Sequence, residues 1–341
     1  MRRFRSSTGI GINLLLMLAC ILPARLVVAQ TDKNQVQVAE LAPEAERAIE
    51  NGLQYLLKHQ NADGSWGGRY KPACTSLALM AFMLKGYFPD EGQHGERLSK
   101  AVGFLTEQAN ATGGYMGVNM YEHGLGTLAL SEVWGTSKRE EVRDVLKKAV
   151  GVILRAQSPQ GGWRYQPRPI DADISVTVMQ IVALSSAKEA GIQVPSRVIE
   201  RAVRYVKGLQ VRTVGGFGYQ HPGDPGFARS AAGVMSLLMA GERESKEVQL
   251  GLDYLRRYPA TKFNMSDYYF YAHYYAIQAM YQAGESYYQE WYPKVRDAML
   301  AKQHKDGSWG GNGEEGDSTY ATSMAILTLG VPYRYLPIYQ R

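Results

Sequence analysis

The sequence predicts an all-α protein in which six helical hairpins close into a ring. Three observations lead to this prediction. A glycine–aromatic turn recurs along the chain, the helices on either side of it alternate between two types, and the first and last turns are the most alike. The 341 residues are 45% hydrophobic and 21% charged, which is enough for a large buried core. This composition argues against a disordered chain and against a polytopic membrane protein.

The recurring turn is clearest near the two ends of the chain. Residues 60–68 read QNADGSWGG and residues 303–311 read QHKDGSWGG. Three weaker copies and one degenerate copy lie between them. The aromatic positions lie 46 to 54 residues apart and define six units: Trp66, Tyr115, Trp163, Phe217, Phe263 and Trp309.

Each unit is expected to hold one amphipathic helix and one apolar helix. The segment before a turn places apolar residues on one helical face, as at Ala48, Leu53 and Leu56. The segment after it is apolar almost throughout, which predicts a helix enclosed by the amphipathic ones. The predicted apolar helices are 76–84, 123–133, 175–184, 230–239, 271–281 and 322–329.

Glycines mark where these apolar helices should end, because glycine readily adopts the left-handed cap conformation. No segment alternates polar and apolar residues with period two, so no strands are expected. An open solenoid would expose an apolar flank at each end, and the likeness of the first and last units therefore favours closure. The predicted caps are Gly86, Gly135, Gly191, Gly241, Gly284 and Gly330.

The N-terminus predicts an export signal, with basic residues, an apolar stretch over 14–22 and small residues before Gln30. Localisation in the periplasm or outside the cell follows from this signal. An uncleaved N-terminus that anchors the protein in a membrane is the alternative, and the leader would then be its only membrane contact. The expected organisation is a signal peptide at 1–29, a linker at 30–42, the ring at 43–330 and a C-terminal tail packed on the ring at 331–341.

The charge distribution argues against a nucleic-acid partner. Four of the 38 basic residues lie within the first 29 positions, where there is no acid, so the remaining 34 face 32 acids. That net charge of +2 lacks the clustered basic excess that a duplex binder needs. The compositional anomaly is instead the 23 tyrosines.

The repeated glutamine followed by Gly-x-Trp resembles the QW repeat of squalene and hopene cyclases, whose superfamily includes the protein prenyltransferase β subunits. The resemblance spans residues 43–330. It implies a single-domain α6/α6 toroid with a central cavity for a hydrophobic small molecule. Class II triterpene cyclases usually use two such barrels, so the resemblance also implies either a partner chain or a different activity.

Residues 169–175, PIDADIS, resemble the Asp-x-Asp-Asp-Thr-Ala acid motif of class II cyclases. Asp171 and Asp173 match the first two aspartates, and Asp173 stands where the family's acid protonates an alkene or epoxide. Ile174 replaces the last aspartate, which weakens the expected charge network and proton relay. The alternative is that Asp173 caps the following helix, a role worth about 1 kcal/mol.

The loop after each turn should carry the site, because that end of the ring opens onto the cavity. Polar and aromatic residues recur there, and the run 267–275 supplies many of the tyrosines. Such a wall can stabilise a cation, stack on sugars or bind an isoprenoid tail, or it can simply pack helices. The catalytic candidates are Asp171, Asp173 and Glu122, and the ligand-binding candidates are Tyr121, His123, Arg229, Tyr269, Tyr271, His273 and Tyr320.

Several other sites are excluded by residues that are missing. Pro72 stands two places before Cys74, where a prenyltransferase zinc site would require an aspartate. No two aspartates are adjacent, which excludes the magnesium-binding motif of class I terpene synthases. We therefore expect no metal and no cofactor.

Two functions remain open. The first, which we favour, is an exported protein whose cavity binds an isoprenoid, a lipid or a glycan without class II cyclase chemistry. The second is an enzyme, which would be either terpenoid-cyclase-like with Asp173 as general acid or a glycan-cleaving toroid.

Overall fold

The computed structural model describes residues 41–137, 139–258, 268–310 and 315–333. Within these ranges the chain forms twelve α-helices, two short 3-10 helices and no β-strand. The predicted all-α fold is thereby confirmed. The signal peptide, all of the linker but residues 41–42, the degenerate turn at Phe263 and most of the tail lie outside the described residues.

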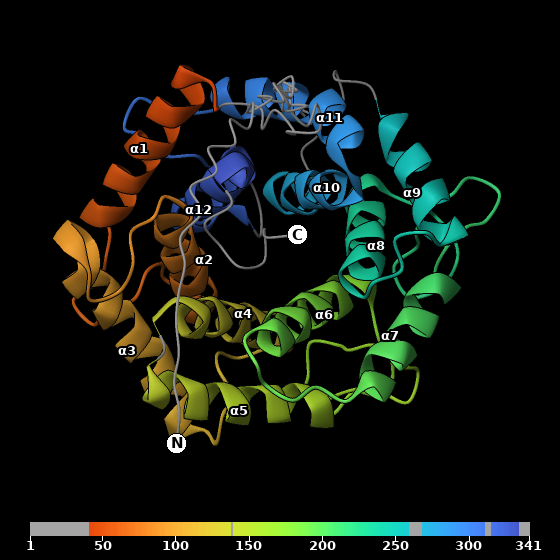
Figure 1. The fold of residues 1–341 in the computed structure, drawn as a ribbon, viewed down its shortest axis with the longest axis horizontal. Coiled ribbons are helices and arrows are strands. Elements are labelled where there is room, and N and C mark those ends of the chain that lie inside the picture. The colour runs from red at the N-terminus through yellow and green to blue at the C-terminus, as the bar shows by residue number, and fades with distance from the viewer. Residues whose placement is uncertain (1–40, 138, 259–267, 311–314, 334–341) are drawn as a thin grey trace, which may run out of the picture. The chain divides into compact units, whose positions relative to one another are not determined.

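The helices form two concentric layers (Figure 1). The outer layer holds α1 (Pro43–Lys58), α3 (Gly95–Ala111), α5 (Glu140–Arg155), α7 (Ser196–Gly208), α9 (Lys246–Arg256) and α11 (Glu285–Leu300). The inner layer holds α2 (Lys71–Leu84), α4 (Met120–Ser137), α6 (Ile174–Glu189), α8 (Phe227–Met239), α10 (Tyr269–Ala283) and α12 (Ser318–Leu329).

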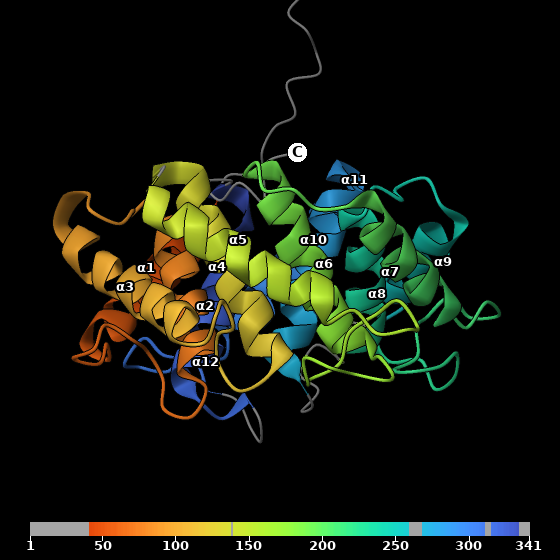
Figure 2. The same cartoon turned by 90° about the horizontal axis from the view of Figure 1, so that it is seen from below.

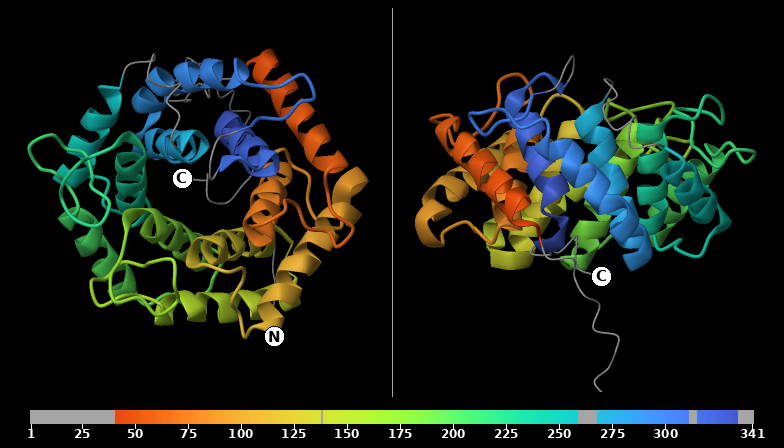
Figure 3. Two further views of the ribbon diagram at one scale, coloured as in Figure 1. Left: turned by 180° about the vertical axis from the view of Figure 1, so that it is seen from behind. Right: turned by 90° about the horizontal axis from the view of Figure 1, so that it is seen from above.

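Hydrophobic patterning decides which layer a helix joins. The outer helix α7 buries one stripe that includes Val198, Ala202 and Val206 and exposes its charged face. The inner helix α2 is buried at every position after Lys71. Each inner helix packs against the next, and α12 packs against α2, so the inner layer closes on itself (Figure 3).

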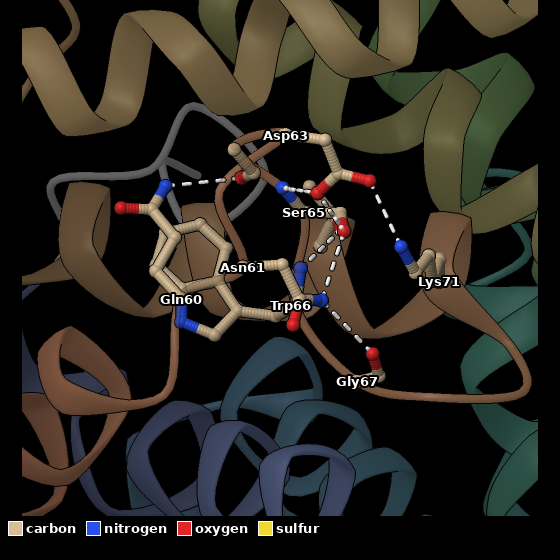
Figure 4. A network of polar contacts seen from close by, with 9 residues as sticks. Gln60, Asn61, Asp63, Ser65, Trp66, Gly67 and Lys71 are labelled. Atoms are coloured by element: carbon tan, nitrogen blue, oxygen red, sulfur yellow. Dashed lines mark hydrogen bonds and ion pairs between the residues drawn. The ribbon is translucent and has the colours of Figure 1, made fainter.

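A glutamine amide joins each well-formed turn to the next outer helix. Gln60 Nε2 donates to the carbonyl of Gly64 within its own turn and to that of Arg97 in α3, at 3.0 and 2.9 Å. The surrounding turn is held by further polar contacts among Asn61, Asp63 and their neighbours (Figure 4). The same bridge is made by Gln157 to Val198, Gln210 to Glu247 and Gln303 to Ala48.

The last of these bridges closes the ring. Gln303 lies beyond the end of α11, and its amide reaches the carbonyl of Ala48 in α1 at 2.8 Å. The indole of Trp309 also extends towards α1, where a side chain in place of Gly52 would lie 3.0 Å from it. First and last hairpins therefore touch through the same contacts that join sequential neighbours.

Three turn tryptophans each tie an outer helix to its inner partner. Trp66 Nε1 donates to the carbonyl of Leu56 in α1, and its backbone amide donates to Thr75 Oγ1 in α2. These groups are buried, so leaving any of them unpaired would cost about 1–3 kcal/mol. Trp163 and Trp309 make the equivalent pairs with Ile153 and Thr177, and with Met299 and Thr322.

The predicted glycines lie at the ends of five of the six inner helices, and four of the five have the expected positive φ. Gly86, Gly191, Gly241 and Gly284 have positive φ beyond the ends of inner helices. Gly135 instead lies inside α4, because that helix continues to Ser137. Gly330 does end α12 as predicted, but its φ of −90° is not the left-handed conformation.

Two further features complete the described chain. Residues 331–333 form a 3-10 helix, in which the Tyr333 hydroxyl donates to Glu46 of α1 and accepts from Lys85 at the end of α2. No helix in the described part of the chain is long and apolar enough to cross a bilayer.

Closure predicts that Gly307→Ala destabilises the protein far more than Gly68→Ala. Gly307 has a φ of 89°, and an added Cβ would lie 2.4 Å from the carbonyl oxygen of Asn51 in α1. The loss should be about 2 kcal/mol or more in the free energy of unfolding, measured by urea denaturation. Gly68 has no atom within 4 Å of a new Cβ and serves as the control. Equal losses in the two variants would contradict this account of closure.

Candidate functional site

A cavity of about 970 Å³ lies at the N-terminal ends of the inner helices, and residues from all six of these helices or from the loops before them line it. These loops include the long connections that gather along the lower edge of the ring in Figure 2. Nine tyrosines line the cavity, which accounts for much of the tyrosine excess: Tyr70, Tyr121, Tyr165, Tyr219, Tyr258, Tyr268, Tyr269, Tyr271 and Tyr320.

The tyrosines of α4 and α10 meet at the cavity wall. The rings of Tyr121 and Tyr271 lie 6.3 Å apart, and Tyr271 packs edge-on against Tyr275 at 4.8 Å. The hydroxyls of Tyr121 and Tyr275 are 3.4 Å apart. Burial raises the pKa of all three phenols, so they remain neutral and present both ring faces and hydroxyl groups.

Glu122 places a buried carboxylate on the wall. It lies in the first turn of α4 and is 2% exposed. Its Oε1 accepts from the Val118 amide at 3.1 Å, whereas its buried Oε2 accepts no hydrogen bond within the described chain. Burial raises the pKa of Glu122, and the backbone amides of Val118 and Ala73 offset part of that rise.

Glu315 is a second buried carboxylate, which the sequence analysis missed. Its oxygens accept from the backbone amides of Phe270 and Tyr271 at 3.2 and 2.8 Å, so it caps α10 from the loop before α12. Burial raises its pKa, and these amides lower it in part. No local pattern predicts this pairing because the two segments are 45 residues apart.

The two histidines have different positions. His273 lines the cavity and packs edge-on against Tyr269 at 4.7 Å. His123 lies outside the lining: its Nδ1 accepts from the Met116 amide at 3.2 Å, and its Nε2 donates to the Ala149 carbonyl at 3.0 Å. It thus takes the place that threonine or serine holds in the other turns. Burial lowers its pKa to about 4, so the ring is neutral.

Asp173 caps α6 rather than facing the cavity. Its Oδ1 accepts from the Val176 amide at 2.9 Å, and the residue is fully buried but absent from the lining. Burial raises its pKa to about 6, although Arg164 Nη1 lies 3.5 Å from Oδ2. Asp171 also lies outside the lining, and its Oδ2 accepts from Gln220 at 3.0 Å.

The cavity therefore brings together seven of the ten predicted residues: Tyr121, Glu122, Arg229, Tyr269, Tyr271, His273 and Tyr320. Arg229 is paired with Asp224 at 3.2 Å. Asp171, Asp173 and His123 are held in turns and caps. The described residues hold no group of three or more His, Cys, Asp or Glu side chains arranged to bind a metal ion.

No family model matches this sequence, and no curated protein is similar to it in sequence. Solved structures do match its fold. A variant of the type II terpene cyclase MstE from Scytonema, in complex with the substrate geranylgeranyl dihydroxybenzoate, is 15% identical. It aligns with a TM-score of 0.62 over 86% of this chain and 98% of its own.

Two further structures match over similar lengths. An inactive variant of an α-1,6-mannanase from Salegentibacter, in complex with α-1,6-mannotriose, is 9% identical. It aligns with a TM-score of 0.63 over 84% of this chain and 98% of its own. A protein from Actinoplanes is 16% identical, with a TM-score of 0.56 over 85% and 99%. At these identities the match shows the fold alone, which is that of the α/α toroid proteins.

The raised pKa of Asp173 predicts a pH-dependent effect of Asp173→Asn, which keeps a neutral cap. Between its ordinary value of 3.8 and about 6, folded Asp173 holds a proton that the unfolded chain has released. Ionisation of Asp173 therefore lowers the free energy of unfolding as the pH rises through this range, by about 3 kcal/mol in total. The stability of the variant relative to wild type should rise by that amount from below pH 4 to pH 7.

Urea denaturation across this pH range measures the effect, and Asp306→Asn is a control of opposite sign. The Ser308 hydroxyl and amide lower the pKa of Asp306, so the stability that ionised Asp306 contributes to the fold is lost as the pH falls. Parallel stability profiles for wild type and Asp173→Asn would show that Asp173 is not the buried acid described here.

Proposed function

We propose that this chain is an exported protein whose tyrosine-lined cavity binds a glycan, with an isoprenoid or lipid as the alternative ligand, and that it carries out no class II cyclase chemistry. The observation that supports a glycan is the mixture of surfaces on the wall. Ring faces alternate there with polar groups that have no partner in the described chain, notably Glu122 Oε2 and the Tyr269 hydroxyl. Sugar rings offer both apolar faces and hydroxyl donors.

The position of Asp173 argues against cyclase chemistry. Protonation of an alkene needs a strong, neutral acid pointing into a dry pocket. One oxygen of Asp173 is committed to the α6 cap, Arg164 lies beside the other, and neither oxygen lines the cavity. The isoprenoid complex of the cyclase MstE, a protein of the same fold, is the reason to keep an isoprenoid as the alternative ligand.

Glycan cleavage is a second candidate function because of Glu122. A carboxyl group whose pKa is raised in an aromatic pocket is suited to act as a general acid. Asp317 lines the same cavity, and after burial the charges of Asp317 and Glu122 raise the pKa of Cys74, so both acids lie near that thiol. The inactive mannanase variant has two consecutive aspartates replaced, a pair that this chain lacks.

Glycan binding predicts that Tyr269→Phe weakens oligosaccharide binding while isoprenoid binding persists, because only the hydroxyl is removed. The expected loss is about five- to tenfold, equivalent to about 1–1.5 kcal/mol for one hydrogen bond. Native mass spectrometry against oligosaccharide and lipid mixtures measures it. Tyr205→Phe is the matched control, since its buried hydroxyl also lacks a partner in the described chain but lies away from the cavity. Wild type that retains neither class of ligand would refute the proposal.

Product analysis of wild type and Glu122→Gln separates binding from cleavage. The binding proposal expects captured oligosaccharides to keep their mass with both proteins. Cleavage by wild type, reduced at least about a hundredfold in Glu122→Gln, would instead establish the second candidate.

A further inference from the structure

Exposed apolar side chains are concentrated at one end of the ring. In the described part of the chain, the exposed large hydrophobic residues are Val118, Tyr165, Ile170, Val214 and Tyr268. All five lie in loops that lead from an outer helix to an inner helix, on the side where the cavity opens (Figure 2). The described loops at the opposite end hold none. Ile170 and Val118 are the extremes, at 87% and 70% exposed.

The local structure holds these side chains outward. The loop bearing Ile170 is tied down at both ends, where the Tyr165 carbonyl accepts from the Met120 amide at 2.8 Å and the Asp173 amide donates to the Trp163 carbonyl at 3.0 Å. Prolines at 167 and 169 restrict the backbone beside Ile170. Tyr165 links this loop to the start of α4, next to Val118. Such exposure of aliphatic groups is unfavourable in water and favours a surface that covers them.

The same loops carry unpaired positive charge. Arg69, Arg168 and Arg212 are exposed and form no ion pair with the described residues. Three acids in the described parts of these loops have ion-pair partners: Asp63 pairs with Lys71, Asp171 with Arg164 and Asp224 with Arg229. Asp306 and Asp317 accept from backbone amides. The exposed surface therefore combines aliphatic side chains with guanidinium groups that have no ion-pair partner among the described residues, one of which, Arg69, lies over the ring of Tyr70 at 5.0 Å.

We propose that this end of the ring docks on an anionic lipid bilayer. Ile170 and Val118 enter the interface, and Arg69, Arg168 and Arg212 contact headgroup phosphates. Tyr165 and Tyr268, which line the cavity and are partly exposed, lie at the depth that tyrosine favours in membranes. The cavity mouth then faces the bilayer. This inference concerns a surface and holds whichever ligand the cavity takes.

Depth-dependent quenching tests the docking face directly. Ile170→Trp introduces a tryptophan at the proposed contact, and Gln193→Trp introduces one at an exposed position between α6 and α7, at the opposite end. The five native tryptophans are buried and give the wild-type baseline. With brominated phosphatidylcholine/phosphatidylglycerol vesicles, we expect Ile170→Trp to be quenched at least twofold more than Gln193→Trp after baseline subtraction. Equal quenching, or none, overturns the proposal.

Charge reversal tests the anionic requirement. Arg168→Glu should reduce sedimentation with the anionic vesicles about tenfold relative to wild type. Arg197→Glu at the opposite end should have little effect, since Arg197 is also exposed and unpaired among the described residues. All proteins carry the same N-terminus, so its contribution cancels. Equal losses, or undiminished binding to pure phosphatidylcholine, would overturn the proposal. Ligand binding in the cavity is measured separately and can persist in either case.

Discussion

The whole ring depends on close approach between each glycine-rich turn and the next outer helix. At Gly64, Gly161, Gly215 and Gly307, a Cβ would lie within 2.6 Å of a backbone atom in the neighbouring helix. Only at this distance can the preceding glutamine amide bridge its own turn and the neighbour's carbonyl. Because one set of contacts serves both sequential and terminal neighbours, the geometry that adds a hairpin is also the geometry that closes the ring.

Closure of the ring determines which polar side chains lie near the cavity. The inner helices do hold buried polar side chains along their length, such as Glu132 and Gln180, but the acids near the cavity lie in or just before the first turns, where free backbone amides need acceptors. Asp173, Asp317 and Glu315 meet that need at α6, α12 and α10. The same turns bound the cavity. Acids therefore gather around it for reasons of folding. An acid is a candidate for function only if it lines the cavity and has an oxygen without a hydrogen bond or ion pair in the described chain, as in Glu122.

The spacing of apolar residues was sufficient to predict the two helix layers. That spacing reflects which helix faces are buried, and the ring buries the same faces in every repeat. The spacing placed the start of each inner helix too late, at 76 instead of Lys71 and at 322 instead of Ser318, because the cavity-lining first turns are polar or aromatic and break the apolar pattern. The lining tyrosines of α4 and α10 were predictable from their place after the turn. Glu315 was not, since its partners are set by tertiary contact.

His123 and Asp173 show why residue type and motif were insufficient to assign the site. Each lies where the repeat needs a group that binds backbone amides: His123 replaces the turn's usual hydroxyl, and Asp173 caps α6. The residues resembling a cyclase acid motif therefore serve a hydrogen-bonding need that the fold creates. Glu122 differs because it lines the cavity and forms no ion pair among the described residues, whereas Asp173 Oδ2 lies 3.5 Å from Arg164 and outside the lining. A water or a ligand hydroxyl that donates to Glu122 Oε2 would satisfy that atom.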